Sequence, residues 1–269
     1  MPRIVPLLAC ATLVCLAAPA PSAEQDALSQ AVAGVHRTPD YRSRDTWRHP
    51  EETLEFFGLR ADMNVIEVYP GGGWYTEILA PFLREEGQLV AAHYGDQSGS
   101  EYRTDSHRKF VAKLAAQPTV YDRVDVIAYD PAKGDTLGKP ASADMILTFR
   151  NIHSFIGAGT LDKFLRDAHA VLKKDGVLGV VQHRARSGTD PGAAGKTGYV
   201  PQDWLIEKVR SAGFELAATS GINANPADTA DHPEGVWTLP PTYRRGEKDR
   251  AKYEAIGESD RMTLRFVKG

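Results

Sequence analysis

Three consecutive glycines separate a short apolar run from an amphipathic stretch in the segment 65–76, which reads Val-Ile-Glu-Val-Tyr-Pro-Gly-Gly-Gly-Trp-Tyr-Thr. The run from Val65 to Val68 predicts a buried strand, and the spacing of Ile78 and Phe82 predicts a helix after the turn. Glycine adopts positive φ without steric cost, and the first turn of a helix carries unpaired N–H groups. The segment therefore predicts a strand, a tight turn and a helix N-terminus that hold a small ligand.

Apolar runs that predict strands alternate along the chain with stretches of helical periodicity. The expected strands span 65–68, 89–94, 124–128, 144–149, 177–182, 214–218 and 262–267. The expected helices span 51–58, 75–82, 161–172 and 204–212, with a further helix around Phe110 to Leu114. Nearly continuous apolar strands joined by helices are buried on both faces. The pattern therefore predicts a doubly wound α/β domain with a mostly parallel seven-stranded sheet.

The residues that follow the expected strands are the first candidates for a site. Ligands bind parallel sheets outside the carboxyl ends of the strands, so these residues should share one rim. They are Glu67 to Gly73, His93, Asp130, Arg150 to His153, and His183. Two polar segments rich in Gly, Ser or Pro, 184–200 and 221–252, do not fit the alternation. We predict that both are lid loops over that rim.

The N-terminus has the pattern of a secretory signal peptide over residues 1–23. Arg3 precedes a short apolar run, and small residues lead to the charged start at Glu24. The run is shorter than the about 20 residues of a membrane-spanning helix. We expect cleavage near Ala23, export to the periplasm and no stable membrane insertion; an uncleaved N-terminal anchor is the alternative.

The part of the chain that remains after cleavage, 24–269, has the length of one large domain. Both cysteines, Cys10 and Cys15, lie in the signal segment, so this part has no disulfide and no cysteine nucleophile. Loss of Arg3 changes the formal net charge from −3 to −4. A mildly acidic chain without a basic run gives no support for nucleic-acid binding.

Several other ligand-binding motifs are incomplete in this sequence. A dinucleotide-binding turn needs a third small residue where Thr76 stands. Gly195-Lys196-Thr197 is similar to the end of a phosphate-binding loop, but Asp190 occupies the place of its first glycine. No Gly-x-Ser-x-Gly elbow occurs. We therefore expect neither a nicotinamide cofactor nor serine hydrolase chemistry.

The acidic residue and glycine turn at 67–73 resemble the first motif of class I S-adenosylmethionine-dependent methyltransferases. The chain is more closely similar to the exported bacterial predicted methyltransferase group, over most of the segment 24–269. The matching stretches are 67–75, 148–153 (Thr-Phe-Arg-Asn-Ile-His) and 231–237 (Asp-His-Pro-Glu-Gly-Val-Trp). The resemblance implies a methyltransferase domain with a Rossmann-like fold and S-adenosylmethionine as cofactor.

The resemblance also implies roles for individual residues at the cofactor. Glu67 helps bind the methionine amino group, and Gly71, Gly72 and Gly73 pass beneath the sugar and the methionine. Asp130 matches the residue beside the adenine amino group; a turn residue before Pro131 is the alternative. Two departures stand at cofactor positions. Tyr69 replaces the first glycine of the motif, and His93 replaces the acid that binds the ribose hydroxyls.

Arg150, Asn151 and His153 follow the fourth strand, where methyltransferases of this class place groups that face the substrate. A neutral His153 can accept a proton from a hydroxyl or amine, because an imidazole titrates near pH 6.5; a histidine that caps a loop is the alternative. For substrate binding we name His183, His232 and Trp237.

The leading hypothesis is methyl transfer from S-adenosylmethionine to an unidentified small molecule. The alternative is an exported small-ligand binding or sensor protein that retains the fold without methyl transfer. A third hypothesis is a metal-assisted hydrolase or lyase, in which His153, His183, Asp228, His232 and Glu234 surround a metal. We assign no metal ligands from these scattered residues. The sequence predicts neither the methyl acceptor nor the oligomeric state.

Overall fold

The computed structural model describes residues 23–269. The predicted signal peptide lies almost wholly outside the described residues, and so do Cys10 and Cys15. Across the described residues, we find no helix with the length and apolar character needed to cross a membrane.

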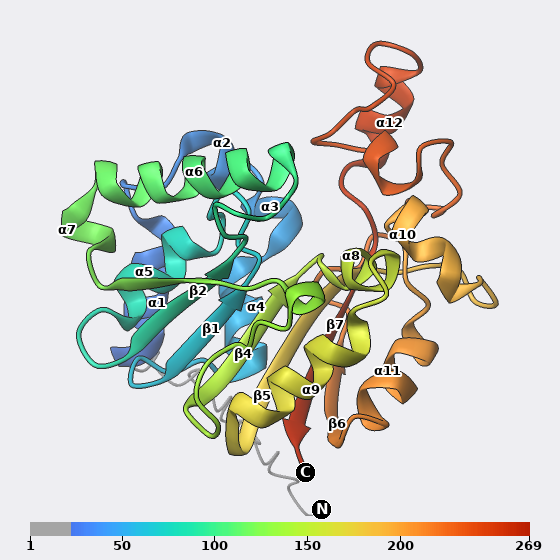
Figure 1. The fold of residues 1–269 in the computed structure, drawn as a ribbon. Helices are drawn as coiled ribbons and strands as arrows, with labels where there is room; N and C mark the ends of the chain where they lie inside the picture. Colours follow the sequence, from blue (N-terminus) through green and yellow to red (C-terminus); the bar gives the residue numbers. More distant parts are fainter. Residues whose placement is uncertain (1–22) are drawn as a thin grey trace, which may run out of the picture.

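A single seven-stranded sheet forms the centre of the molecule, with the strand order β3-β2-β1-β4-β5-β7-β6 (Figure 1). Its strands are β1 (Asn64–Val68), β2 (Gln88–His93), β3 (Val124–Ala128), β4 (Ala143–Phe149), β5 (Leu172–His183), β6 (Phe214–Ser220) and β7 (Arg261–Lys268). Strands β1 to β5 pair in parallel, and β7 is antiparallel to both β5 and β6. The predicted doubly wound, mostly parallel seven-stranded sheet is confirmed.

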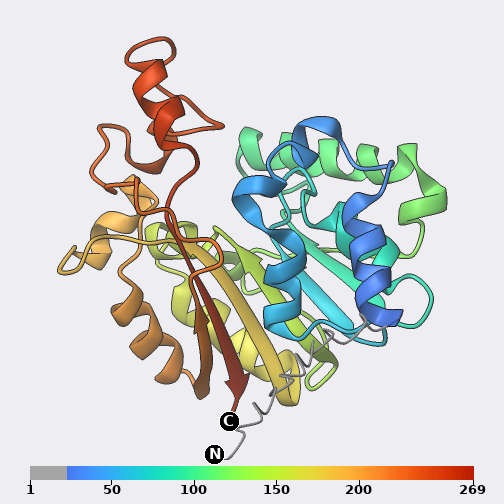
Figure 2. The same cartoon turned by 180° about the vertical axis from the view of Figure 1, so that it is seen from behind.

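Helices cover both faces of the sheet (Figures 1 and 2). One face is packed by α1 (Ala23–Ala33), α4 (Pro50–Phe57), α5 (Thr76–Leu83) and α6 (Glu101–Ala116), and the other by α8 (Ile152–Gly157), α9 (Leu161–Val171) and α11 (Gln202–Arg210). Successive residues of β1 enter opposite layers, since Val65 packs with the first group and Ile66 with the second. This two-sided burial explains why the strands are apolar throughout.

Shorter elements complete the fold and lie mostly at its edges. They are α2 (Pro39–Arg42), α3 (Asp45–Arg48), α7 (Pro118–Tyr121), η1 (Pro131–Lys133), η2 (Pro191–Ala193), α10 (Ala194–Thr197), η3 (Gly235–Thr238) and α12 (Arg250–Ile256). Four of them fall wholly or partly inside the two predicted lid loops. The segment with η3 and α12 rises above the carboxyl ends of the parallel strands (Figure 1).

The boundary between α9 and β5 differs from the prediction. The expected helix 161–172 ends at Val171, and Leu172 already pairs with Ala143 of β4. Asp175 has a φ of 62°, which lets the chain turn within the strand before regular pairing resumes at Val177. Asp175-Gly176 therefore marks an irregularity inside β5.

Candidate active site

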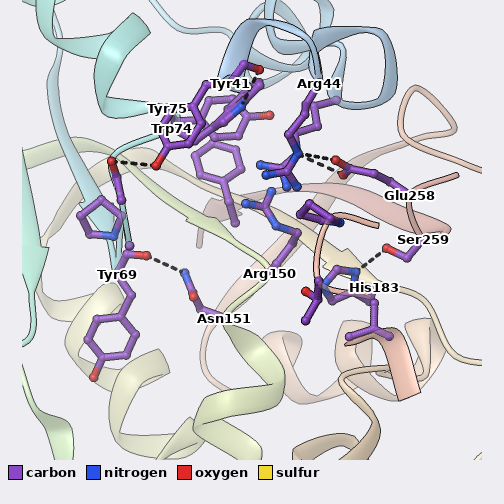
Figure 3. A pocket seen from close by; sticks show the side chains of 18 of the residues that line it. Tyr41, Arg44, Tyr69, Trp74, Tyr75, Arg150, Asn151, His183, Glu258 and Ser259 are labelled. Carbon is purple, nitrogen blue, oxygen red and sulfur yellow. Dashed lines mark hydrogen bonds and ion pairs between the residues drawn. The ribbon is translucent and has the colours of Figure 1, made fainter. Parts of the chain in front are cut away.

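The carboxyl ends of β1, β4 and β5 meet at a cavity of about 330 Å³ (Figure 3). The predicted site residues that line it are Glu67, Tyr69, Gly71, Gly72, Arg150, Asn151, His153, His183 and Trp237. Four other predicted residues, Gly73, His93, Asp130 and His232, are not part of its lining. The structure therefore brings together most of the rim that the strand order predicts, and it leaves the residues assigned to adenosine outside.

The glycine turn after β1 is a left-handed bend. Gly71 and Gly73 have φ values of 59° and 82°, and the amide of Gly73 donates to the carbonyl of Pro70 at 3.0 Å. A Cβ on Gly73 would lie 3.2 Å from the Phe110 ring, whereas a Cβ on Gly71 would meet nothing within 4 Å. Gly73 is thus needed for packing, and Gly71 leaves open space beside the turn.

Neighbouring elements hold this turn from several sides. The carbonyl of Gly72 accepts hydrogen bonds from the Tyr41 hydroxyl at 3.2 Å and from the Lys113 ammonium at 3.0 Å. The side-chain amide of Asn151 donates to the carbonyls of Val68 at 2.9 Å and Tyr69 at 3.3 Å. Asn151 thus fixes the exit of β1 against the exit of β4, so its contacts here are with the backbone of the turn.

Glu67 is a buried carboxyl group at the cavity. It is 2% exposed, and the Thr76 hydroxyl donates to its Oε2 at 2.6 Å. Burial raises the pKa of Glu67 to about 7, although the hydrogen bond from Thr76 and the positive charges of Arg150 and Lys113 oppose the shift. A cationic amine beside Glu67 would favour the ionised form, since opposite charges lower the pKa of a carboxyl group.

His93 lies beneath the glycine turn and not in the cavity. It is fully buried, and its Nε2 lies 3.1 Å from the carbonyl oxygen of Gly71, so Nε2 is the donor of this bond. Burial lowers the pKa of His93 to about 4. The imidazole therefore stays neutral and supports the turn, with its Nδ1 buried and unpartnered among the described residues.

Both carboxylate oxygens of Asp130 likewise have neighbours within the protein. Its Oδ1 accepts from the amide of Ala132 at 3.1 Å and so caps η1, as the turn interpretation expects. Its Oδ2 lies 3.7 Å from Arg103 Nη1. Only a small cavity of about 30 Å³ adjoins Asp130, and Tyr69 and Phe155 contribute to its walls.

An aromatic cluster fills the space between the β2 and β3 exits and α8. The Tyr69 ring lies 4.3 Å from the Tyr94 ring, 5.1 Å from the Phe155 ring and 6.1 Å from the Tyr129 ring, measured between centroids. Tyr69 reaches this cluster because its φ of 50° turns its side chain away from the strand direction. Adenine beside Asp130 would need the space that the Tyr69 ring takes.

The residues at this site therefore suit the methionine end of the predicted cofactor but not its adenosine end. Glu67, Gly71 and Gly72 adjoin open space and suit the methionine part of S-adenosylmethionine. The adenosine part does not fit the residues as arranged, because His93 is bonded to Gly71 and the Tyr69 ring fills the place beside Asp130. The cavity of about 30 Å³ beside Asp130 is too small for adenine, so binding of a whole adenosyl group there requires that residues in its wall, such as Tyr69, move.

His153 and His183 stand side by side at the cavity, with ring centroids 6.0 Å apart. The Gln182 amide donates to His153 Nδ1 at 3.3 Å, because its oxygen is engaged by the Ile152 amide. Burial lowers the pKa of His153 to about 4, so the neutral ring carries its proton on Nε2. This tautomer makes His153 a hydrogen-bond donor, whereas the predicted general base needs a free ring nitrogen.

His183 has a different partner at the start of the last strand. Its Nδ1 lies 2.6 Å from the Ser259 hydroxyl (Figure 3). Burial lowers the pKa of His183 well below its usual value, and the positive charges of Arg150 and Arg261 act in the same direction. Both histidines are therefore neutral near pH 7.

The segment 221–252 contributes to the cavity through Trp237 but not through His232. The Trp237 ring packs edge-on to His153, with centroids 5.7 Å apart. The Nε2 of His232 lies 2.8 Å from Asp228 Oδ1, and Asp228 also accepts from the Tyr199 hydroxyl at 3.0 Å. His232 thus belongs to a buried brace, away from the predicted substrate position.

The described residues contain no group of side chains arranged to bind a metal ion. Among residues 23–269, no three His, Cys, Asp or Glu side chains converge in a way that could hold a metal ion. His153 and His183 line the cavity, Asp228 and His232 form the brace, and Glu234 is exposed outside both.

The sequence analysis did not predict the second wall of the cavity, which consists of Arg44, Arg48, Glu258 and Ser259. Arg44 and Arg48 come from before β1, and Glu258 and Ser259 come from just before β7. The position of Glu258 and Ser259 follows from the antiparallel direction of β7. An antiparallel strand starts at the rim where the parallel strands end, so residues just before β7 lie at that rim. The two arginines lie in a polar stretch without a motif, and only tertiary packing places them here.

Comparisons with known proteins support the fold. No protein-family model matches the sequence, and no curated protein matches it. A solved structure of a SAM-dependent methyltransferase from Aquifex aeolicus is similar, with a TM-score of 0.56, 16% identity, and coverage of 90% of this chain and 98% of that one. An arsenic(III) S-adenosylmethionine methyltransferase from Chlamydomonas reinhardtii has a TM-score of 0.52 and 13% identity, over 93% of this chain and 74% of that one.

A third similar structure is that of an enzyme with a different activity. The [4+2]-cyclase SpnF has a TM-score of 0.56 and 18% identity, over 91% of this chain and 92% of that one. At such identities the likeness concerns the fold, and the same fold serves more than one chemistry. The chain has the Rossmann-like fold found in class I S-adenosylmethionine-dependent methyltransferases.

Proposed function

We propose that the protein is an S-adenosylmethionine-dependent methyltransferase that acts on a small molecule. The observation that supports this most is the buried carboxyl of Glu67, which lines the cavity together with Gly71 and Gly72 of the left-handed turn. When bound, the cofactor supplies an electrophilic methyl group. Glu67 would hold its amino group, and the turn would contact its methionine part.

The chain's own contribution would be alignment of the acceptor and exclusion of water. Effective positioning of two reactants lowers a barrier without any acid or base. The proton on His153 Nε2 suits a donor that orients the acceptor, and Trp237, Pro240 and Pro241 cover the cavity from the segment 221–252. We assign positioning roles to His153 and Arg150 in this reaction.

A second candidate function is favoured by the stack around Tyr69. In this proposal the protein is a small-ligand binding or sensor protein that keeps the fold and holds a ligand other than the adenosyl cofactor. The support is that the adenosine side is filled by Tyr69, Tyr94 and Phe155, whereas the cavity at Glu67 and Arg150 is open.

Calorimetric titration of the mature chain with S-adenosylmethionine tests the first proposal. We expect binding, and we expect Glu67→Gln to weaken it about tenfold or more, because a charged hydrogen bond contributes about 1.5–3 kcal/mol. Asp62→Asn is the matched control, since the Asp62 side chain is 58% exposed in the loop before β1.

An absence of binding heat would contradict the proposed methyl transfer. Mass spectrometry of molecules that co-purify with the chain then separates the candidates. A nucleoside thioether supports the transferase, and an unrelated metabolite supports the binding protein.

We also propose that residues 1–23 act as a cleaved export signal. The pattern of Arg3, a short apolar run and small residues before Glu24 supports this. N-terminal sequencing of the protein from an expressing bacterium should find Glu24 at the start. A chain that retains residues 1–23 in the membrane fraction would indicate the uncleaved anchor instead.

A further inference from the structure

One wall of the cavity carries more positive than negative charge. Arg44, Arg48 and Arg261 all donate to the single carboxylate of Glu258, at 2.6, 3.0 and 2.9 Å. One carboxylate cannot neutralise three guanidinium groups, so this wall keeps an excess of positive charge. The Nη2 of Arg44 is buried and has no partner among the described residues, and Arg44 lines the cavity.

Arg150 adds a fourth guanidinium to the same cavity. Its backbone amide donates to Val181 at 2.7 Å and so continues the pairing of β4 with β5, and its φ of 65° then turns the chain sharply. No carboxylate or carbonyl in residues 23–269 accepts from its guanidinium, which Figure 3 draws near the centre of the cavity without a dashed line. A left-handed arginine is strained, and such strain is concentrated at functional sites.

Arg150 nevertheless remains charged at neutral pH. Burial, together with the positive charges of Arg261 and Arg44, lowers its pKa to about 10, while Glu258 opposes the shift. A cation that is partly withdrawn from water and surrounded by like charges is unfavourable unless an anion joins it. The unpaired guanidinium of Arg150 therefore destabilises the free protein, and an anionic ligand would supply the missing partner.

His153 supplies a further donor of the same kind. Its Nδ1 is occupied by the Gln182 amide, which also donates to the carbonyl of Gly198 at 2.8 Å and is thereby fixed in orientation. The cavity-lining ring therefore has only its Nε2–H to offer. At this cavity, Arg150, Arg44 and His153 each present a hydrogen-bond donor that has no acceptor among residues 23–269.

We propose that the cavity binds a small molecule through an oxyanion group, a phosphate or a carboxylate, held by Arg150 and Arg44 with His153 as an additional donor. The planar fork of a guanidinium matches two oxygens of such a group, and several donors around one anion match its lone pairs. This inference names the substrate class of the proposed function and rests on the acceptor binding in this cavity. It does not depend on the methyl donor.

The test measures anion binding by the mature chain through thermal shift and calorimetry. The probes are inorganic phosphate, malonate and acetate, each compared with potassium chloride at equal ionic strength. We expect phosphate or malonate to raise the melting temperature beyond the chloride control. A stronger response to phosphate identifies a phosphate group, and a stronger response to malonate identifies a dicarboxylate.

Variants of Arg150 test whether the anion binds at this residue. Arg150→Met should weaken anion binding about 10-fold to 100-fold, and Arg150→Lys should weaken it less, because the charge remains while the fork is lost. Arg210→Met is the matched control, since Arg210 lies at the end of α11 with a half-exposed side chain paired to Glu207. This control should bind anions as the parent chain does.

The stability of the anion-free protein provides an independent readout. Arg150→Met should leave the melting temperature in low salt unchanged or higher, because the guanidinium has no partner to lose and faces like charges. The inference is overturned if no anion exceeds the chloride control, or if Arg150→Met binds anions normally and lowers the melting temperature. If the chain binds anions but not S-adenosylmethionine, the proposed methyl transfer is contradicted and this inference stands. If it binds S-adenosylmethionine but not anions, this inference is contradicted and the proposed methyl transfer stands.

Discussion

Tyr69 shows how one residue changes what a glycine turn can accommodate. The sequence identifies the departure from the family motif, since a tyrosine stands where a glycine is usual. It does not indicate where the ring goes, because that depends on the φ of 50° and on Tyr94 and Phe155, which arrive from two other elements. The same holds for His93, whose replacement of an acid is visible in the sequence and whose bond to Gly71 is not.

Replacing Tyr69 by glycine should open the adenosine side of the site. We expect Tyr69→Gly to bind S-adenosylmethionine about tenfold more tightly, because the ring no longer competes with adenine. Loss of the buried ring should destabilise the chain by about 2–4 kcal/mol, after relief of the positive φ is included. Calorimetry and urea unfolding measure the two effects.

Tyr69→Phe is the control for this change, since it keeps the ring and removes only the hydroxyl. It should bind the cofactor as weakly as the parent chain does. Equal affinity of the glycine and phenylalanine variants would show that the ring does not obstruct binding.

Glu67 should give the protein a characteristic pH dependence. Its pKa is about 7 in the folded chain and 4.5 without burial, so the folded state binds the proton more tightly than the unfolded state. This stabilisation is full below about pH 4.5 and is lost as pH rises through about 7. Glu67→Gln cannot ionise and should lack the loss, which is about 3 kcal/mol.

Urea unfolding of both proteins at several pH values checks this expectation. The buried histidines titrate in both chains, so their effect cancels in the difference between the two profiles. Parallel profiles between about pH 4 and about pH 8 would mean that Glu67 is not perturbed by burial.

At the scale of the element, the turn between β1 and α5 depends on contacts from distant parts of the chain. Tyr41 of α2, Lys113 of α6 and Asn151 before α8 all donate to its carbonyl groups. Strand and helix periodicity predicted the turn itself correctly, together with the exits of β1, β4 and β5. The helices α2 and α3 were not predicted, because each is only four residues long and its hydrophobic pattern is too short to recognise.

Gly71 and Gly73 form a matched pair for testing the turn. Both have positive φ, but only a Cβ on Gly73 would approach a neighbouring ring closely, at 3.2 Å from Phe110. Gly71→Ala should cost about 1–2 kcal/mol from backbone strain, and Gly73→Ala should cost about 1–3 kcal/mol more from overpacking. Chemical denaturation gives both values, and equal losses would argue against the contact with Phe110.

At the scale of the whole molecule, the cavity is closed by a segment that the brace of Asp228 and His232 fastens to the sheet. Asp228 accepts from Tyr199, from His232, and from the amide of Asp260 at 2.8 Å. Burial by itself would raise the pKa of Asp228, but these hydrogen bonds hold it below its usual value. The sequence suggested a lid here from composition alone, and the attachment could not be predicted, because Tyr199 and Asp260 are far away in the chain.

Breaking this brace should loosen the segment 221–252. Asp228→Asn keeps the shape of the side chain but removes its charge, and we expect a loss of about 2–4 kcal/mol with faster tryptic cleavage after Arg244 or Arg245. Asp231→Asn is the control, since Asp231 is half-exposed and its side-chain partners among residues 23–269 are Arg186 and Thr229. Equal cleavage rates in the two variants would mean that the brace does not hold the segment.

The second wall of the site joins the two ends of the domain. Arg44 and Arg48 come before the first strand, and the Glu258 that holds them immediately precedes the last one. A fragment cut before Glu258 has the glycine turn and Arg150 but not the carboxylate that arranges these guanidinium groups. Affinity for an anion would therefore depend on two segments that lie more than 200 residues apart, and cleavage of the backbone between them should weaken it.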